Sequence, residues 1–193
     1  ISLTKTLIRL IPTMPAMAFM GVFLAFVGVG MIRPYSNANE KIRYLSMMNN
    51  GLFTVIGSVI CTAYLNTNRL SFFIIACLVF HAISFVLYGI DVEFSQNDTR
   101  KHVIVQVSCA TLGLANSIFI TCIYTLISLR YEWCISIAMW IFMCINGIIG
   151  GLLTLELNCF EWALMLTVLA IPSYVGMLGE YYRMNREKEQ DRK

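Results

Sequence analysis

The stretch LSFFIIACLVFHAISFVLYGI, residues 70–90, runs for 21 residues without an Asp, Glu, Lys or Arg. An α-helix rises 1.5 Å per residue, so about 20 apolar residues are enough to cross the hydrocarbon core of a bilayer. The stretch also lacks the alternation of polar and apolar residues that is typical of transmembrane barrel strands. It therefore predicts a helix that spans a membrane once.

Five further uncharged stretches follow the same pattern, and they lie at 10–32, 44–68, 102–129, 133–155 and 162–179. Hydrophobic residues make up 58% of the 193-residue chain and charged residues 13%, whereas soluble domains contain about 45–50% and about 25%. Because lipid offers backbone groups no hydrogen-bond partner, such stretches form helices. The sequence predicts an all-α membrane fold with six transmembrane helices, at about 10–32, 46–66, 70–90, 103–128, 133–154 and 161–180.

The basic residues indicate which side of the membrane each loop occupies. With six spans, both chain ends lie on one side together with the second and fourth loops, and nine of the fourteen Lys and Arg residues belong to that side. Basic loops face the cytoplasm, so we expect cytoplasmic ends in the plasma membrane or an endomembrane. Residues 1–182 then form one six-span domain, and residues 183–193 form a cytoplasmic tail that extends the last helix.

One loop carries a candidate modification site. Asn97 begins the only Asn-X-Ser/Thr sequon of the chain and falls in the third loop, which faces the outside in this topology. The sequon predicts glycosylation at Asn97, but the acceptor also lies close to the membrane. A sequon that is never glycosylated is the alternative.

Uncharged polar residues inside the predicted spans are candidates to line a cavity or to face a partner. They are His81, Asn116, Thr121, Tyr124 and Asn146. The six uncharged stretches contain no carboxylate, lysine or arginine, although intramembrane ionisable groups usually mark ion and proton paths. This argues against proton coupling in this part of the protein. His81, which titrates near neutral pH in water, serves either in coupling or as a hydrogen-bonded structural residue.

Small residues four positions apart predict faces on which helices pack closely. Gly113 pairs with Ser117, and Gly147 pairs with Gly151. These faces serve either as sliding contacts between moving helices or as static packing. A lone six-helix unit is expected to leave them without a partner, and the chain begins at Ile1 rather than Met. We therefore expect a preceding six-helix half.

Enzyme and metal signatures are missing from the sequence. It contains no G-x-S-x-G, no H-E-x-x-H and no glycine-rich phosphate loop. The seven cysteines include no C-x-x-C pair, which argues against a disulfide framework and a zinc site. We expect no catalytic residue, no cofactor and no metal. The net charge of +3 is a topology signal, so we expect no nucleic-acid partner either.

The segment TLGLANSIFITCIYTL, residues 111–126, resembles the fourth span of the second half in one branch of the major facilitator superfamily. That branch is typified by the nematode "uncoordinated" channel-regulatory protein and its vertebrate relatives. Proteins of this superfamily contain twelve helices in two six-helix halves. The resemblance implies that this chain is the C-terminal half of such a bundle.

The resemblance also implies a function. Transporters of this superfamily have an Asp- and Arg-rich signature between the second and third spans of each half, and this chain has only LNTNR at residues 65–69. The weak signature favours the regulatory branch. The expected function is a regulatory or trafficking subunit of another membrane protein such as an ion channel, with the C-terminal half of a solute transporter as the alternative.

Overall fold

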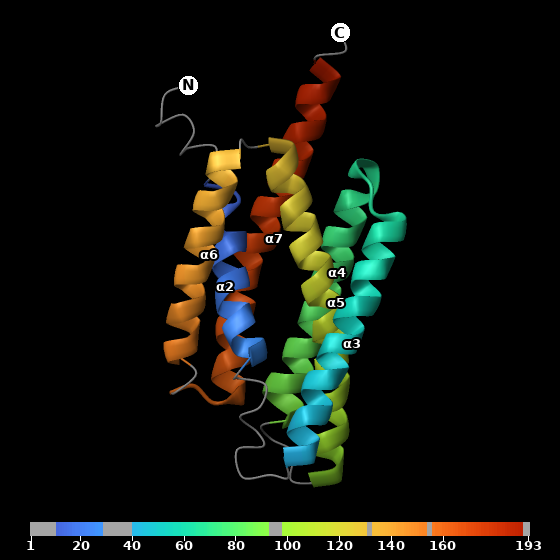
Figure 1. Cartoon of the computed structure of the whole chain (residues 1–193), viewed down its shortest axis with the longest axis vertical. Helices are drawn as coiled ribbons and strands as arrows, with labels where there is room; N and C mark the ends of the chain where they lie inside the picture. The colour runs from blue at the N-terminus through green and yellow to red at the C-terminus, as the bar shows by residue number, and fades with distance from the viewer. Residues whose placement is uncertain (1–10, 29–39, 93–97, 131–132, 154–155, 191–193) are drawn as a thin grey trace.

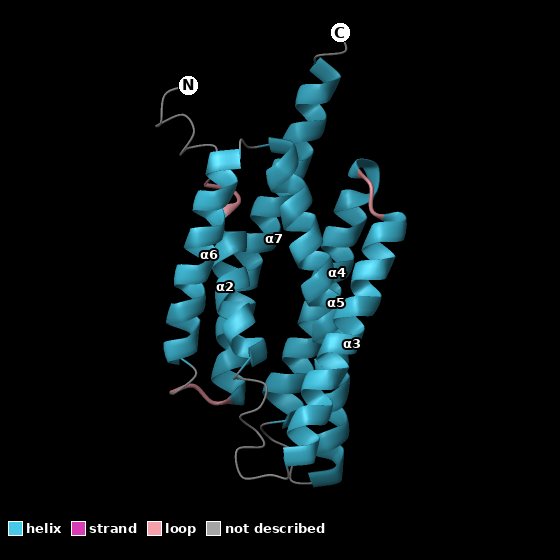
Figure 2. Cartoon of the chain, viewed as in Figure 1, coloured by secondary structure: helices cyan, strands magenta, loops and turns pink. Residues whose placement is uncertain are grey.

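The computed structural model describes residues 11–28, 40–92, 98–130, 133–153 and 156–190, and these residues form helices and short turns without a strand (Figure 2). The long helices are α2 (Met14–Gly28), α3 (Glu40–Tyr64), α4 (Leu70–Val86), α5 (Asp98–Arg130), α6 (Trp133–Leu153) and α7 (Cys159–Gln190). A short 3-10 turn, η2 (Thr67–Arg69), precedes α4, and a π-helical segment, η3 (Leu87–Val92), continues it. The predicted all-α architecture is confirmed.

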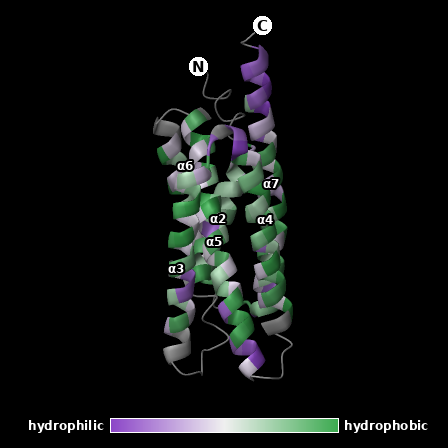
Figure 3. Cartoon of the chain, turned by 90° about the vertical axis from the view of Figure 1, so that its right-hand side faces the viewer, coloured by the Kyte–Doolittle hydropathy of each residue, from purple (hydrophilic) through white to green (hydrophobic). Residues whose placement is uncertain are grey.

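Within the described ranges, five helices are long and apolar enough to cross a membrane, namely α3 to α7. The helix α2 is equally apolar but contains only 15 residues. The helices are formed mostly by hydrophobic residues along the body of the bundle, and hydrophilic residues gather at the C-terminal end of α7 (Figure 3). These helices identify an integral membrane protein and agree with the uncharged stretches of the sequence.

Local side chains define where α4 and α7 begin. The Asn66 side chain accepts a hydrogen bond from the Arg69 backbone N–H at 3.0 Å, which closes the turn before α4. At the start of α7, Asn158 Oδ1 accepts from the Glu161 N–H at 2.8 Å, and Glu161 Oε2 accepts from the Asn158 N–H at 2.9 Å. This reciprocal pair is a capping box, which satisfies two backbone donors at a helix start. The helix then continues past Pro172 to Gln190, so the predicted tail extends it.

The six long helices form two groups of three. The first group contains α2, α6 and α7, and the second contains α3, α4 and α5 (Figure 1). Within the first group, α6 and α7 both pack on α2, and within the second, α3 and α4 both pack on α5. The groups meet chiefly through α4 and α7.

The contacts of one group reproduce those of the other. In this correspondence α2 matches α5, α3 matches α6 and α4 matches α7. The α2–α6 contact then corresponds to the α3–α5 contact, and the α2–α7 contact to the α4–α5 contact. The α4–α7 contact corresponds to itself. The matched helices run in opposite directions, as Figure 1 shows for α2 and α5. The correspondence thus relates two consecutive three-helix units, α2 to α4 and α5 to α7, whose corresponding helices have matching neighbours.

Glycines allow the closest helix crossings. A Cβ at Gly113 of α5 would lie 3.1 Å from the Thr54 backbone nitrogen and closer still to the Asn50 carbonyl oxygen, both on α3. In the same crossing, Ser117 of α5 lies against Gly57 of α3. The predicted packing role of Gly113 and Ser117 therefore corresponds to the contact between α3 and α5.

A second crossing joins α2 and α6, and it differs from the predicted pair. Gly147 lies against the backbone of Gly21, and Gly150 lies against Val22. A Cβ at Gly151 would meet nothing within 4 Å. The pair that faces α2 is therefore Gly147 with Gly150. Residues three positions apart also lie on one face of a helix, and this face of α6 packs against α2.

The small-residue faces are therefore filled from within the chain. The expectation that Gly113, Ser117 and Gly147 lack partners in a lone six-helix unit is wrong, because α3 and α2 cover them. Many large apolar residues lie exposed on the outside of the bundle. Examples are Val55 and Val59 on α3 and Ile141 and Ile148 on α6.

Two glycine substitutions test the α3–α5 crossing. We expect Gly113→Ala to lower the free energy of unfolding by about 1–3 kcal/mol, because the new methyl group overpacks against a backbone that cannot move aside easily. The matched control is Gly51→Ala on α3, where a Cβ meets nothing within 4 Å. The control should be neutral or stabilising by up to about 1 kcal/mol, since alanine favours helix. Thermal unfolding in detergent compares the two, and equal midpoints would contradict the crossing.

Candidate functional site: a buried histidine junction

His81 lies at the centre of the bundle, where the two three-helix groups meet. The spacing of Cys77, His81 and Phe85 puts them on one face of α4, and that face points into the core. His81 is 1% exposed. Its neighbours come from α2, α5 and α7 as well, so four helices converge on one imidazole ring.

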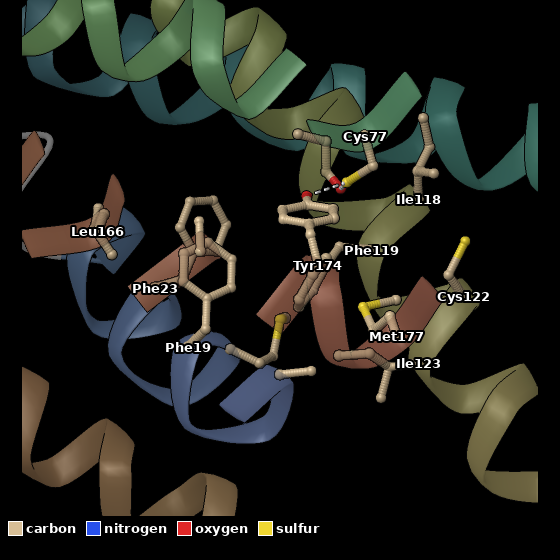
Figure 4. Packing of buried hydrophobic residues seen from close by; sticks show 14 of the residues in the cluster. Phe19, Phe23, Cys77, Ile118, Phe119, Cys122, Ile123, Leu166, Tyr174 and Met177 are labelled. Carbon is tan, nitrogen blue, oxygen red and sulfur yellow. Dashed lines mark hydrogen bonds between the residues drawn. The ribbon is translucent and has the colours of Figure 1, made fainter. Parts of the chain in front are cut away.

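A short chain of hydrogen bonds starts at this ring. His81 Nδ1 lies 2.5 Å from the Tyr174 hydroxyl of α7, and the hydroxyl donates to Cys77 Sγ at 3.0 Å. The Cys77 thiol in turn donates to the carbonyl of Ala115 on α5 at 3.1 Å. Figure 4 shows Tyr174 reaching Cys77 across the core. If the imidazole carries its proton on Nδ1, then His81, the Tyr174 hydroxyl and the Cys77 thiol each donate one proton. This tautomer satisfies all three hydrogen bonds.

Four phenylalanines enclose the imidazole. Phe19, Phe23 and Phe119 meet it edge to face at centroid separations of 5.3, 4.9 and 5.7 Å. Phe85 stacks on it at 5.5 Å with an interplanar angle of 15°. Such a shell keeps water away from the ring, which is 1% exposed, and surrounds it with aromatic contacts.

The environment of His81 favours the structural interpretation over coupling. Its Nε2 atom is buried and has no hydrogen-bond partner in the part of the chain that the structure describes. A proton relay needs a partner on each side of the imidazole, whereas this ring has one on the Nδ1 side only. A buried cation in an apolar shell also carries a large desolvation cost. The geometry suits a neutral ring that links α4 to α7.

Other polar side chains also bond inside the bundle. Asn49 Nδ2 of α3 donates to Gln106 Oε1 of α5 at 2.6 Å, and Gln106 Nε2 donates to Ser46 Oγ at 2.7 Å. Nearby, Asn50 Nδ2 donates to the Cys109 carbonyl at 3.1 Å. These bonds fasten α3 to α5 and leave few polar groups for a solute path between these two helices.

The remaining predicted polar residues do not converge on one cavity. Thr121 Oγ1 donates to the Ser117 carbonyl at 2.7 Å, and Asn146 Nδ2 donates to the Phe142 carbonyl at 2.8 Å, so both bond to their own helices. Tyr124 is 58% exposed on the outside.

Asn116 is the exception among these residues. It is only 7% exposed, and its Oδ1 atom is buried with no hydrogen-bond partner among the described residues. The candidate glycosylation site Asn97 lies outside the described residues.

Sequence reasoning missed two participants of the core. Tyr174 follows Pro172 and was not singled out, although the spacing of Ala170, Tyr174 and Met177 predicts one buried face of α7. Glu180, which ends the last uncharged stretch, continues that face and is 1% exposed. Arg183 Nη1 lies 3.9 Å from Glu180 Oε2. The helical spacing of these residues, rather than the absence of charge, indicates that Tyr174 and Glu180 are buried.

Comparison with known proteins assigns no role to this site. No protein-family model, curated protein or solved structure matches the chain. The resemblance of residues 111–126 to the major facilitator superfamily thus rests on the sequence pattern alone. Function is argued from the geometry of the described residues.

Two tyrosines of α7 provide a test of the junction. We expect Tyr174→Phe to lower the free energy of unfolding by about 1–3 kcal/mol, because it removes a hydroxyl that contacts both His81 and Cys77 and leaves buried groups without partners. Tyr182→Phe is the matched control, since Tyr182 is 59% exposed on the same helix. Unfolding by denaturant in detergent micelles compares the two. Equal stabilities would show that the hydroxyl of Tyr174 makes no net contribution.

Proposed function

We propose that this chain is a six-helix module of the major facilitator type that serves as a regulatory or trafficking subunit of another membrane protein, such as an ion channel. The observation that carries the proposal is the internal use of the intramembrane polar groups. His81 is sealed by phenylalanines, and Asn49, Asn50 and Gln106 bond between α3 and α5. Side chains committed to packing are unsuited to guide a solute or an ion.

The two inverted three-helix units support the architectural part of the proposal. Inverted repeats of three helices are nested within each half of major facilitator proteins, and the matching contacts of α2 to α4 and α5 to α7 support this part of the proposal. We take α2, which lies within the uncharged residues 10–32, as the first of six spans. Both chain ends are cytoplasmic, and a second six-helix half completes the bundle.

The outer surface supports binding to a membrane partner. The outward side of α6 carries Ile141, Ile145 and Ile148, and that of α3 carries Val55 and Val59. These faces are compatible with lipid and with the helices of another membrane protein. Since no long hydrophilic domain occurs in the described ranges, recognition of a partner would take place largely within the bilayer.

The C-terminal half of a solute transporter is the second candidate. Inverted repeats occur in many secondary transporters, which bind their substrates near the bilayer midplane. Asn146 lies beside a groove between α6 and α7, where an amide could contact a solute. The enclosed His81 and the uncharged spans weigh against gradient-driven transport and place this candidate second.

Asn116 separates the two candidates. Its Oδ1 is buried without a hydrogen-bond partner among the described residues, so we expect Asn116→Leu to be neutral or stabilising for the isolated fold. Oδ1 is closed off from a partner inside the bundle, so a bond to a partner comes from the 7% of Asn116 that is exposed. We expect the same variant to reduce recovery of a crosslinked membrane partner by the loss of that bond, since interhelical hydrogen bonds contribute about 0.5–2 kcal/mol in membranes. Tyr182→Leu, at a site that is 59% exposed on α7 and is not among the candidate partner-facing residues, is the matched control for lost polarity.

The measurement has two arms on the full-length protein. In cells, photocrosslinking from Val59 and Ile148 captures the partner for the parent and both variants. In liposomes, solutes are screened under an imposed pH or sodium gradient. Partner capture that falls in Asn116→Leu, with no gradient-driven uptake in any protein, supports the regulatory function. Robust uptake abolished by Asn116→Leu while partner capture is unchanged would contradict it and support the transporter.

A further inference from the structure

A groove of about 530 Å³ lies on the side of the bundle where α6 and α7 flank α2. Ile149 and Leu153 of α6 form one wall, Leu164 and Val168 of α7 form the other, and Val22 of α2 contributes between them. The polar Asn146 also borders the groove, but its amide nitrogen is engaged by the Phe142 carbonyl of its own helix. The walls are therefore apolar, in a part of the chain that crosses the membrane.

The length of the groove along the helix axes is close to the thickness of the hydrocarbon in one lipid leaflet. The lining residues of α7 run from Glu161 to Leu169, and eight residues of helix rise about 12 Å. One leaflet contributes about 15 Å of hydrocarbon, half of the roughly 30 Å core. The helices α6 and α7 run antiparallel, so Leu153 and Glu161 share the outer end, and Asn146 and Leu169 share the deep end. An acyl chain that enters between Leu153 and Glu161 would end near Asn146 and Leu169.

A carboxylate stands at the outer end of this groove. Glu161 is exposed in the first turn of α7, at the boundary between the polar loop and the apolar span. Its Oε2 atom accepts the Asn158 N–H within the capping box. The second carboxylate oxygen has no hydrogen-bond or ion-pair partner within the described ranges. A negative charge there attracts an ammonium group and repels phosphate esters that lack one.

We propose that the groove between α6 and α7 binds one zwitterionic phospholipid, with an acyl chain along Leu153, Leu164 and Val168 and the cationic amine of its headgroup at Glu161. The site discriminates against anionic lipids and free fatty acids, whose headgroups meet the carboxylate without a compensating cation. The inference goes beyond the proposed function and does not depend on it. Occupation by lipid would also shield the apolar gap between α6 and α7.

Two variants separate the chain-binding and headgroup-binding parts of the site. Glu161→Gln removes the charge and keeps the capping box, because glutamine also accepts the hydrogen bond at this position. Val168→Trp fills the groove from its α7 wall. Val79→Trp on α4 is the matched control, since Val79 is 50% exposed and does not line the groove. Helix content by circular dichroism and elution volume establish that each variant is folded.

The full chain is equilibrated with vesicles of equimolar phosphatidylethanolamine and phosphatidylglycerol, extracted in mild detergent and analysed by native mass spectrometry. We expect one retained lipid, with a preference of about two- to fivefold for phosphatidylethanolamine, the size of a partly exposed ion pair. Glu161→Gln should keep the lipid and lose the preference, Val168→Trp should lose the lipid, and Val79→Trp should match the parent.

Three results would overturn the proposal. The first is a parent chain that retains no lipid, which would leave the groove to another protein or empty. The second is equal retention of the two lipids by the parent, and the third is an unchanged lipid complement in a folded Val168→Trp variant. None of these results bears on partner capture or on uptake, so failure here and failure of the proposed function are distinguishable.

Discussion

The hydrogen bond between His81 of α4 and Tyr174 of α7 is the polar link on which the arrangement of the two helix groups depends. Apolar contact alone gives little preference between lipid and protein inside a bilayer, so helices there are held by close packing and by interhelical hydrogen bonds. At this point Tyr174 also donates to Cys77, and Phe19 and Phe23 of α2 close over the ring. Four of the six long helices therefore contribute to one buried cluster.

Around that cluster, each group has its own means of close packing. Gly21 and Gly147 bring α2 and α6 together, and Gly113 lets α5 approach the backbone of α3. Amide side chains add hydrogen bonds to the second crossing, as Asn49 does with Gln106. Gly113, Gly147 and the amides of Asn49 and Asn50 are thus used in packing inside the bundle. This distribution leaves large aliphatic residues for the outside, and it is the physical basis for proposing a partner-binding module ahead of a transporter.

The positions of the helices could be predicted from the sequence better than their rotations and packing partners. Uncharged stretches are long-range features that lipid imposes on composition, so α3 to α7 could be located from them. Helix rotation depends on periodicity within those stretches, and an almost uniformly apolar helix such as α2 shows little. For that reason Gly151 was paired with Gly147 in place of Gly150, Tyr174 was overlooked, and His81 could be placed in a span without its partners being identified. The spacing of Tyr174 and Glu180 carried the missing signal.

The central claim is that His81 and Tyr174 act together to hold the two groups, and a double-mutant cycle measures this most directly. Unfolding free energies of the parent, His81→Phe, Tyr174→Phe and the double variant give the coupling energy between the two side chains. A parallel cycle with Tyr182→Phe provides the background for an exposed tyrosine on the same helix. A coupling of about 0.5–2 kcal/mol between His81 and Tyr174, absent from the Tyr182 cycle, is predicted. Additivity within about 0.3 kcal/mol in both cycles would contradict the account.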